Sequence, residues 1–225
     1  MIKNDKLAGI LAIVTYILMY IFTIFIPLII PLEKFSTSTR YLISSVYEII
    51  IVIIIFLIHS KTVKKDFKQY FTNIKYYLKN YIKYWLLALA AMYICNLILF
   101  IISGGIAANE QSVRELFEYF PVITFILAAF IAPILEEAIF RISLYKIIGQ
   151  YKWLFILLSG LIFGGMHILG NVNSIIDFLF IIPYSIPGCF FAYALHKSDN
   201  MFVPISLHMI HNTFALILLI ITSLL

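Results

Sequence analysis

The chain has 225 residues, of which 63% are hydrophobic and only 12% are charged, and its mean hydropathy is +1.04. A soluble protein of this composition would expose more apolar surface than water tolerates, so the composition excludes a soluble globular fold. The formal net charge of +5 does not indicate a nucleic-acid partner, because the basic residues fall between apolar stretches. We therefore predict an all-α polytopic membrane protein in the lipid bilayer.

Seven stretches are long and apolar enough to cross the bilayer as helices, which takes about 20 residues at about 1.5 Å per residue. In chain order they are Leu7 to Pro31, Tyr41 to Ile58, Trp85 to Ile102, Phe120 to Ile148, Trp153 to Leu169, Ile175 to Leu195 and Met201 to Leu225. The first is too long for a signal peptide and lacks a small-residue cleavage site, so we expect it to be retained. We predict one integral membrane domain over 1–225, with N-terminal spans in 1–119 and the polar motifs in 120–225.

The distribution of basic residues predicts the orientation. Thirteen of the sixteen Lys and Arg residues fall on one side of the seven spans, which predicts a cytoplasmic N-terminus and an external C-terminus in the cell membrane. From His59 to Lys83, lysines alternate with apolar residues at helical spacing, which predicts one amphipathic helix on the cytoplasmic leaflet. A solvated basic loop is the alternative. We expect Gly104 to Tyr119 to form an acidic external loop.

Two adjacent acids, Glu136 and Glu137, lie within the apolar run from Phe120 to Phe140. An ionisable group at this depth costs a few kcal/mol or more, so it is usually paired or works in a cavity. Glu137 and Arg141 are four residues apart and share a helix face, so we expect them to pair. Glu136 points about 100° away and is the freer carboxylate, suited to proton transfer.

Two later spans carry further polar groups. His167 follows Gly160 and Gly164, whose spacing predicts a helix face that a neighbouring helix approaches closely. His208 and Asn212 are four residues apart and share a face of the last span. At about 1.5 Å per residue from the cytoplasmic ends, Glu136 and His167 lie about 18 and 21 Å deep, and His208 and Asn212 about 10 and 16 Å deep. These four side chains are therefore expected to converge.

Other ionisable residues have weaker assignments. His211 borders the face of His208, and its direct involvement stays open. We expect hydrogen-bonding roles for two histidines near span ends, and we assign no partner to two intramembrane acids. These residues are His59, His196, Glu48 and Asp177.

The three motifs read Glu136-Glu137-Ala-Ile-Phe-Arg141, Phe163-Gly-Gly-Met-His167 and His208-Met-Ile-His-Asn212. In this order, on three spans, they resemble the signatures of the CPBP intramembrane proteases, a family that includes the CAAX prenyl proteases and bacterial proteins of bacteriocin processing and self-immunity. The resemblance covers roughly residue 121 to the C-terminus. Ile142 and Met209 stand where the family often has a glycine and a small residue.

The resemblance implies an intramembrane glutamic endopeptidase that needs no metal or other cofactor. Glu136 and His167 would activate a water, and His208 and Asn212 would stabilise the oxyanion. Glu137 and Arg141 would then hold the geometry of the site. The implied substrate is a membrane-associated peptide or protein.

The Ile-, Lys-, Asn- and Tyr-rich composition suggests an AT-rich bacterial genome, where peptide processing or bacteriocin self-immunity is favoured over prenylated CAAX substrates. Two alternatives stay open. A metal-dependent hydrolase could use Glu136, His167, His208 and His211 as ligands, although no familiar zincin spacing occurs. A non-enzymatic immunity or scaffold protein is the other.

Overall fold

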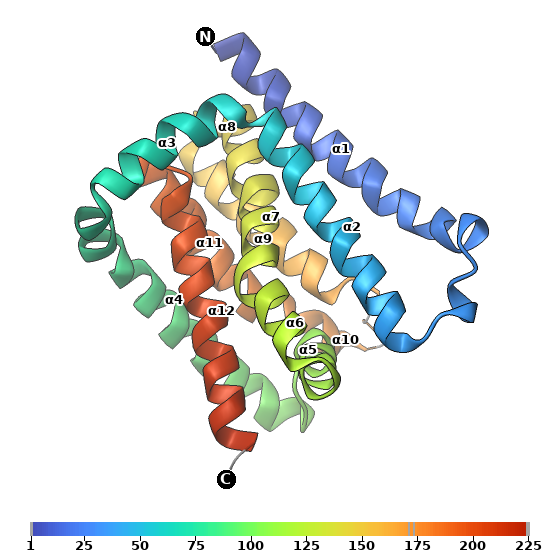
Figure 1. The fold of residues 1–225 in the computed structure, drawn as a ribbon. Coiled ribbons are helices and arrows are strands. Elements are labelled where there is room, and N and C mark those ends of the chain that lie inside the picture. The colour runs from blue at the N-terminus through green and yellow to red at the C-terminus, as the bar shows by residue number, and fades with distance from the viewer. Residues whose placement is uncertain (1, 171, 173, 224–225) are drawn as a thin grey trace.

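A computed structural model describes residues 2–170, 172 and 174–223, which form a bundle of helices with no strand (Figure 1). Two of the helical elements, η2 and η3, are π-helical turns. The elements are α1 (Ile2–Ile29), η1 (Leu32–Lys34), α2 (Thr37–Ile58), α3 (Ser60–Thr72), α4 (Ile74–Ser103), α5 (Ala108–Tyr119), α6 (Pro121–Ile126), η2 (Leu127–Ile131), α7 (Ala132–Glu137), η3 (Ala138–Ser143), α8 (Leu144–Ile148), α9 (Lys152–Ile168), α10 (Ile175–Leu179), α11 (Ile181–Ser198) and α12 (Phe202–Ser223).

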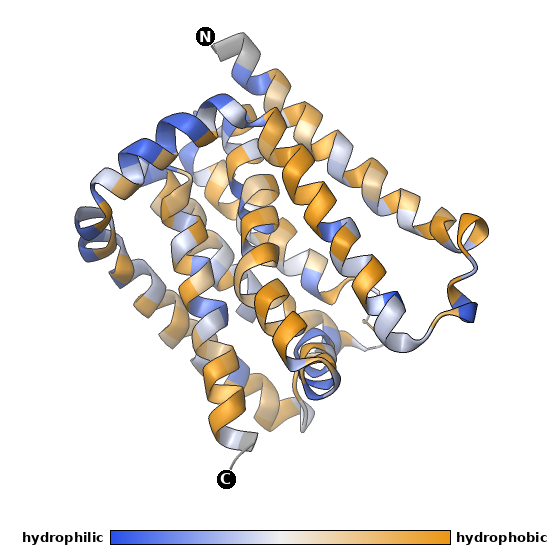
Figure 2. Cartoon of the chain, viewed as in Figure 1, coloured by the Kyte–Doolittle hydropathy of each residue, from blue (hydrophilic) through white to orange (hydrophobic). Residues whose placement is uncertain are grey.

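The predicted all-α polytopic membrane fold is confirmed. In the described part of the chain, six helical segments are long and apolar enough to span a membrane, and α9 is a shorter apolar helix of 17 residues. Hydrophobic residues cover most of the bundle, and hydrophilic residues gather on α3 at one end and α5 at the other (Figure 2). The first turns of α1 and the last turns of α12 lie at opposite ends (Figure 1), as an odd number of crossings requires. Leu224 and Leu225 of the seventh predicted span lie outside the described residues.

The amphipathic segment is shorter than predicted. Helix α3 ends at Thr72, and the residues from Ile74 onward begin the long helix α4. The Asn73 side chain donates to the Gln69 carbonyl at 3.0 Å, and such local bonds from asparagine compete with helix continuation. The prediction of one helix reaching Lys83 was therefore wrong.

The expected external loop is largely helical. Only the short stretch around Gly104 is irregular, and α5 occupies most of the segment. Gly104 adopts a left-handed φ of 71° that ends α4, a conformation that glycine adopts readily. Within α5, Arg114 pairs with Glu110 one turn earlier at 2.6 Å, which supports a helix at the polar surface.

The fourth predicted span, Pro121–Ile148, is one continuous helical segment interrupted by the π-helical turns η2 and η3. A π turn frees a backbone carbonyl from the regular ladder, and such turns are frequent at functional sites. One carbonyl in each turn accepts a side-chain hydrogen bond: the Ala128 carbonyl from the Asn212 amide at 2.8 Å, and the Ala138 carbonyl from the Ser143 hydroxyl at 2.8 Å. The six residues of α7 between the turns carry both glutamates. The span thus departs from regular α-helical geometry on either side of the glutamates.

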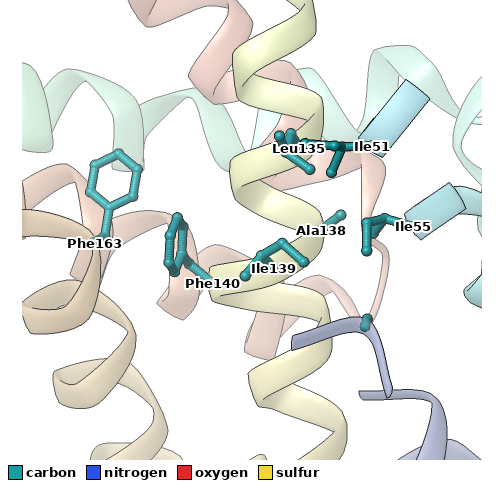
Figure 3. Packing of buried hydrophobic residues seen from close by; sticks show 8 residues of the cluster. Ile51, Ile55, Leu135, Ala138, Ile139, Phe140 and Phe163 are labelled. Atoms are coloured by element: carbon teal, nitrogen blue, oxygen red, sulfur yellow. The ribbon is translucent and has the colours of Figure 1, made fainter. Parts of the chain in front are cut away.

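Helix α2 packs against α7 (Figure 3). Ile51 and Ile55 of α2 belong to one buried apolar cluster with Leu135 and with residues at the start of η3. In the same cluster the rings of Phe140 and Phe163 meet edge to face, with centroids 5.9 Å apart. This packing fixes the segment that carries the two glutamates.

The predicted glycine face of α9 is confirmed, and its partner is α11. A Cβ atom on Gly160 would lie 2.9 Å from the Ser185 carbonyl, and one on Gly164 would lie 2.6 Å from the Ile181 carbonyl. Only glycine permits backbones to approach this closely. The close approach brings Tyr184 of α11 against His167 at the end of α9, with ring centroids 4.6 Å apart.

Candidate active site

A cavity of about 710 Å³ lies between α4, α7, α9, α11 and α12, with α5 at one end. Its lining includes all four residues that the sequence predicted to converge, together with the adjacent histidine of the last motif. These residues are Glu136, His167, His208, His211 and Asn212. The predicted convergence is thus confirmed.

Glu137 and Arg141 form the expected ion pair, and both side chains are completely buried. The Arg141 Nε lies 3.2 Å from Glu137 Oε2, and the Arg141 guanidinium also lies 4.2 Å from the centre of the Phe163 ring. The other Glu137 oxygen accepts a hydrogen bond from His208 Nδ1 at 2.7 Å. A buried carboxylate needs such partners to offset its desolvation. Glu137 therefore links α7, η3 and α12.

Glu136 faces the cavity instead. Its side chain is 24% exposed, whereas that of Glu137 is 0% exposed, so only Glu136 is accessible to a molecule in the cavity. Its Oε2 lies 3.6 Å from His208 Nε2. The His208 ring thus stands between the two glutamates, with Nδ1 toward Glu137 and Nε2 toward Glu136.

His167 is held at the last turn of α9. Its Nδ1 lies 2.9 Å from the Phe163 carbonyl, which can only accept a hydrogen bond, so Nδ1 carries the proton. In the neutral ring, Nε2 is then the acceptor. The ring is stacked on Tyr184 and lies 4.3 Å from the Phe163 ring, so its orientation is fixed on two sides.

The two remaining polar residues of α12 differ in their surroundings. Asn212 donates one amide hydrogen to the Ala128 carbonyl of η2 and has a second amide hydrogen. The Nδ1 of His211 is buried and has no hydrogen-bond partner among the described residues. Its ring lies 6.4 Å from the ring of Phe191.

The sequence-predicted residues outside this cluster lie elsewhere. Asp177 accepts a hydrogen bond from the Ser174 hydroxyl at 3.0 Å, at the N-terminus of α10. Glu48 is half-buried on α2 and does not line the 710 Å³ cavity. His59 hydrogen-bonds Ser143 at 2.9 Å, as expected for a histidine near a span end. Among the described residues, no group of three or more His, Cys, Asp or Glu side chains could hold a metal ion.

Sequence reasoning missed Tyr184 and the Ala128 carbonyl. Tyr184 lies in an apolar stretch with no motif, and only the approach of α11 to α9 brings it to His167. Ala128 contributes a backbone atom, for which a sequence has no residue-type signal.

These features define the class: a polytopic helical membrane protein with a buried Glu–Arg–His cluster beside a cavity that exposes a second glutamate. Residues 118–214 match the family described as "Type II CAAX prenyl endopeptidase Rce1-like", which confirms the resemblance carried by the three motifs. The matched segment includes Glu136, His167 and Asn212.

Two curated bacterial proteins are also similar. The chain is 28% identical over 117 residues to "Putative membrane peptidase YdiL" of Bacillus subtilis (strain 168), covering 51% of this chain and 44% of that protein. It is 36% identical over 89 residues to "UPF0177 protein YaiF" of Lactococcus lactis subsp. lactis (strain IL1403), covering 40% of this chain and 37% of that protein. The chain thus spans less than half the length of these relatives. No solved structure matches the chain.

Proposed function

We propose that the protein is an intramembrane endopeptidase that hydrolyses a peptide bond of a membrane-associated peptide or protein. The observation that carries this proposal is that Glu136, His167, His208 and Asn212, all within the Rce1-like segment, line the 710 Å³ cavity together. Water-mediated acyl transfer requires a base, a group that orients the water and donors for the oxyanion. The cavity offers a carboxylate, an imidazole with a free acceptor nitrogen and two hydrogen-bond donors.

In the proposed reaction, Glu136 takes a proton from a water molecule that also hydrogen-bonds His167 Nε2. The water oxygen attacks the peptide carbonyl carbon, and the carbonyl oxygen becomes the oxyanion of a tetrahedral intermediate. Glu136 then returns the proton to the leaving nitrogen as the C–N bond breaks. The products are a carboxylate and an amine, and no other reactant is consumed.

The oxyanion would be stabilised from α12. Asn212 has the second hydrogen of its amide for this purpose, since the first binds Ala128. His208 donates to Glu137 from Nδ1, and its Nε2 would donate to the oxyanion. Glu137, paired with Arg141, keeps the His208 ring in that orientation. Donors fixed before the reaction stabilise the developing charge without reorganisation.

The biological setting is part of the proposal. Both curated relatives are bacterial, and one carries the name of a membrane peptidase. Together with the AT-rich type of composition, this favours a bacterial membrane peptide over a prenylated protein as the substrate, in peptide processing or bacteriocin self-immunity. The protein would lie in the cell membrane with a cytoplasmic N-terminus and would use no cofactor.

The test is hydrolysis by purified protein of a panel of membrane-associated peptides, with the products identified by mass spectrometry. We expect defined cleavage that persists in EDTA or phenanthroline. Inactivation by chelators with recovery on added zinc would favour the metal-dependent alternative, with His211 as a ligand. Absence of cleavage, together with protection or signalling that survives Glu136→Gln, would favour the immunity or scaffold alternative.

A further inference from the structure

A second cavity, of about 140 Å³, adjoins the active-site cavity at the end that carries α5. Its polar lining consists of Asn109, Gln111, His167 and Asp177, and its apolar lining includes Ala107 and Phe180. Ile106, Asn109 and His167 line both cavities, so the two cavities lie next to each other at these residues.

The second cavity lies at the polar end of the bundle. Helix α5 is rich in charged and amide side chains and forms one of the two hydrophilic regions of the ribbon (Figure 2). The lining residues Ala108 and Gln111 of α5 are exposed at the surface. The second cavity therefore opens among residues that suit the boundary between membrane and water.

Building on the function proposed above, we propose that this second cavity is the water entrance of the active site. It takes water from the α5 side and delivers it past Asn109 to His167 and Glu136. A water molecule needs about 10–15 Å³ of accessible space and two to four polar partners, and this cavity has both the room and the partners. The ligand assigned to this site is the hydrolytic water itself.

The need for a separate entrance follows from the lining of the larger cavity. Apart from the catalytic residues and the polar residues Asn96, Asn109, Glu110 and Arg114, that lining is mostly apolar and includes Leu97, Phe100, Leu216 and Leu219. A bound peptide segment would cover these side chains and exclude water from that direction. The His167 ring meets the second cavity as well, and its Nδ1 is already bonded to Phe163. Nε2 is thus the nitrogen that is left to receive an incoming water.

The first arm of the test measures water access and needs no activity. In a background with both native cysteines replaced, Cys95→Ala and Cys189→Ala, the variant Ala107→Cys places a thiol in the second cavity. The matched control is Ala129→Cys, which is also buried, at 0% exposed against 6% for Ala107, but lines neither cavity. We expect a charged, membrane-impermeant thiosulfonate to modify position 107 at least about tenfold faster than position 129. Equal rates would overturn the proposal.

The second arm measures turnover. Gln111→Cys is modified at the mouth of the cavity, with its neighbour Ser112→Cys as the control, since Ser112 lines neither cavity. We expect modification at position 111 to lower kcat at least about tenfold with KM within about twofold, and dithiothreitol to restore it. Modification at position 112 should change neither value.

Three outcomes of the second arm would overturn the proposal: an unchanged kcat at position 111, a raised KM alone, or an equal loss at position 112. A raised KM alone would show that this space binds peptide. In a further outcome, the unmodified protein with both native cysteines replaced hydrolyses no peptide while the reagent still reaches position 107. In that case the proposed peptidase function is wrong, but the second cavity is open to water.

Discussion

Glu136 and Glu137 are neighbours in sequence yet occupy opposite environments. Adjacent helical residues point about 100° apart, so one turn of α7 directs Glu137 into the protein and Glu136 into the cavity. One Glu137 carboxylate oxygen accepts a hydrogen bond from His208, and the other is ion-paired with Arg141. The difference between a buried, paired carboxylate and one exposed to the cavity thus follows from position on the helix.

The Glu137–Arg141 pair should be strongly coupled. Removing one partner leaves a buried charge alone, which costs about 3–5 kcal/mol, whereas removing both avoids that penalty. We expect Glu137→Gln and Arg141→Met each to reduce folded yield and thermal stability more than the double variant does. The measurement is monodisperse yield and Tm in detergent for all four proteins. Equal values for the three variants would show that the two residues are not coupled.

The donors on α12 should act on the rate of the reaction. Asn212→Ala should lower kcat by about 100- to 1,000-fold, the usual loss when one oxyanion donor is removed. His208→Ala should lose at least as much, because it also releases Glu137. His211→Ala should stay within a few-fold of the parent. Steady-state kinetics on one cleaved peptide would check this order, and a loss at His211 as large as at Asn212 would contradict it.

At the scale of elements, the sequence predicted the spans and the three motifs but not the shape of the span that carries Glu136. The length of an apolar span follows from its local composition, which can be read from the sequence. The π turns η2 and η3 depend on donors from other parts of the fold, such as Asn212 for the Ala128 carbonyl. The break at Asn73 and the helix α5 depend on local bonds and an ion pair that hydropathy does not register.

A chain of hydrogen bonds joins the end of α2 to η3. The His59 Nε2 donates to the Ser143 hydroxyl at 2.9 Å, and that hydroxyl donates to the Ala138 carbonyl at 2.8 Å. Lys146 donates to His59 Nδ1 at 3.1 Å. With both ring nitrogens engaged in this way, His59 is neutral, and its side chain is buried. The second π turn is therefore stabilised from outside the span.

These hydrogen bonds of His59 predict that the protein loses stability at low pH. Burial, and then the charge of Lys146, lowers the pKa of His59 from its ordinary 6.5 to about 4. Between these values the unfolded chain takes up a proton at His59 that the folded chain does not, so the free energy of unfolding falls as the pH drops from about 6.5 to about 4. The decline should reach a few kcal/mol at the lower limit, on the order set by about 1.4 kcal/mol per pKa unit. Thermal unfolding in detergent across this range is the measurement.

The control for this prediction is His59→Gln, which keeps a donor for Ser143 but cannot titrate. Burial raises the pKa of Asp66, which makes a contribution of opposite sign in both proteins and cancels in the comparison. The parent should therefore lose more stability than His59→Gln on acidification. Parallel pH profiles would show that His59 is not the group responsible.

At the scale of the whole molecule, the proposed orientation rests on the distribution of lysine and arginine. The ends of α1 and α12 lie on opposite sides of the bundle (Figure 1), and α3, with its lysines, lies at the end where α1 begins. Reporter fusions at the two ends of the chain should therefore report different compartments, with the N-terminal reporter in the cytoplasm. Reporters in the same compartment would contradict the seven-span arrangement.

The central claim is that the cavity-facing Glu136 acts as the base in peptide hydrolysis, and replacing its one charge tests this most directly. Glu136→Gln keeps the size of the side chain but cannot accept a proton from water, and general-base catalysis typically contributes about 100- to 10,000-fold. The control is Glu118→Gln, on the exposed part of α5 and outside both cavities. We predict that kcat falls by that range in folded, membrane-inserted Glu136→Gln and is unchanged in Glu118→Gln. A Glu136→Gln protein that hydrolyses peptide at the parental rate would contradict the account.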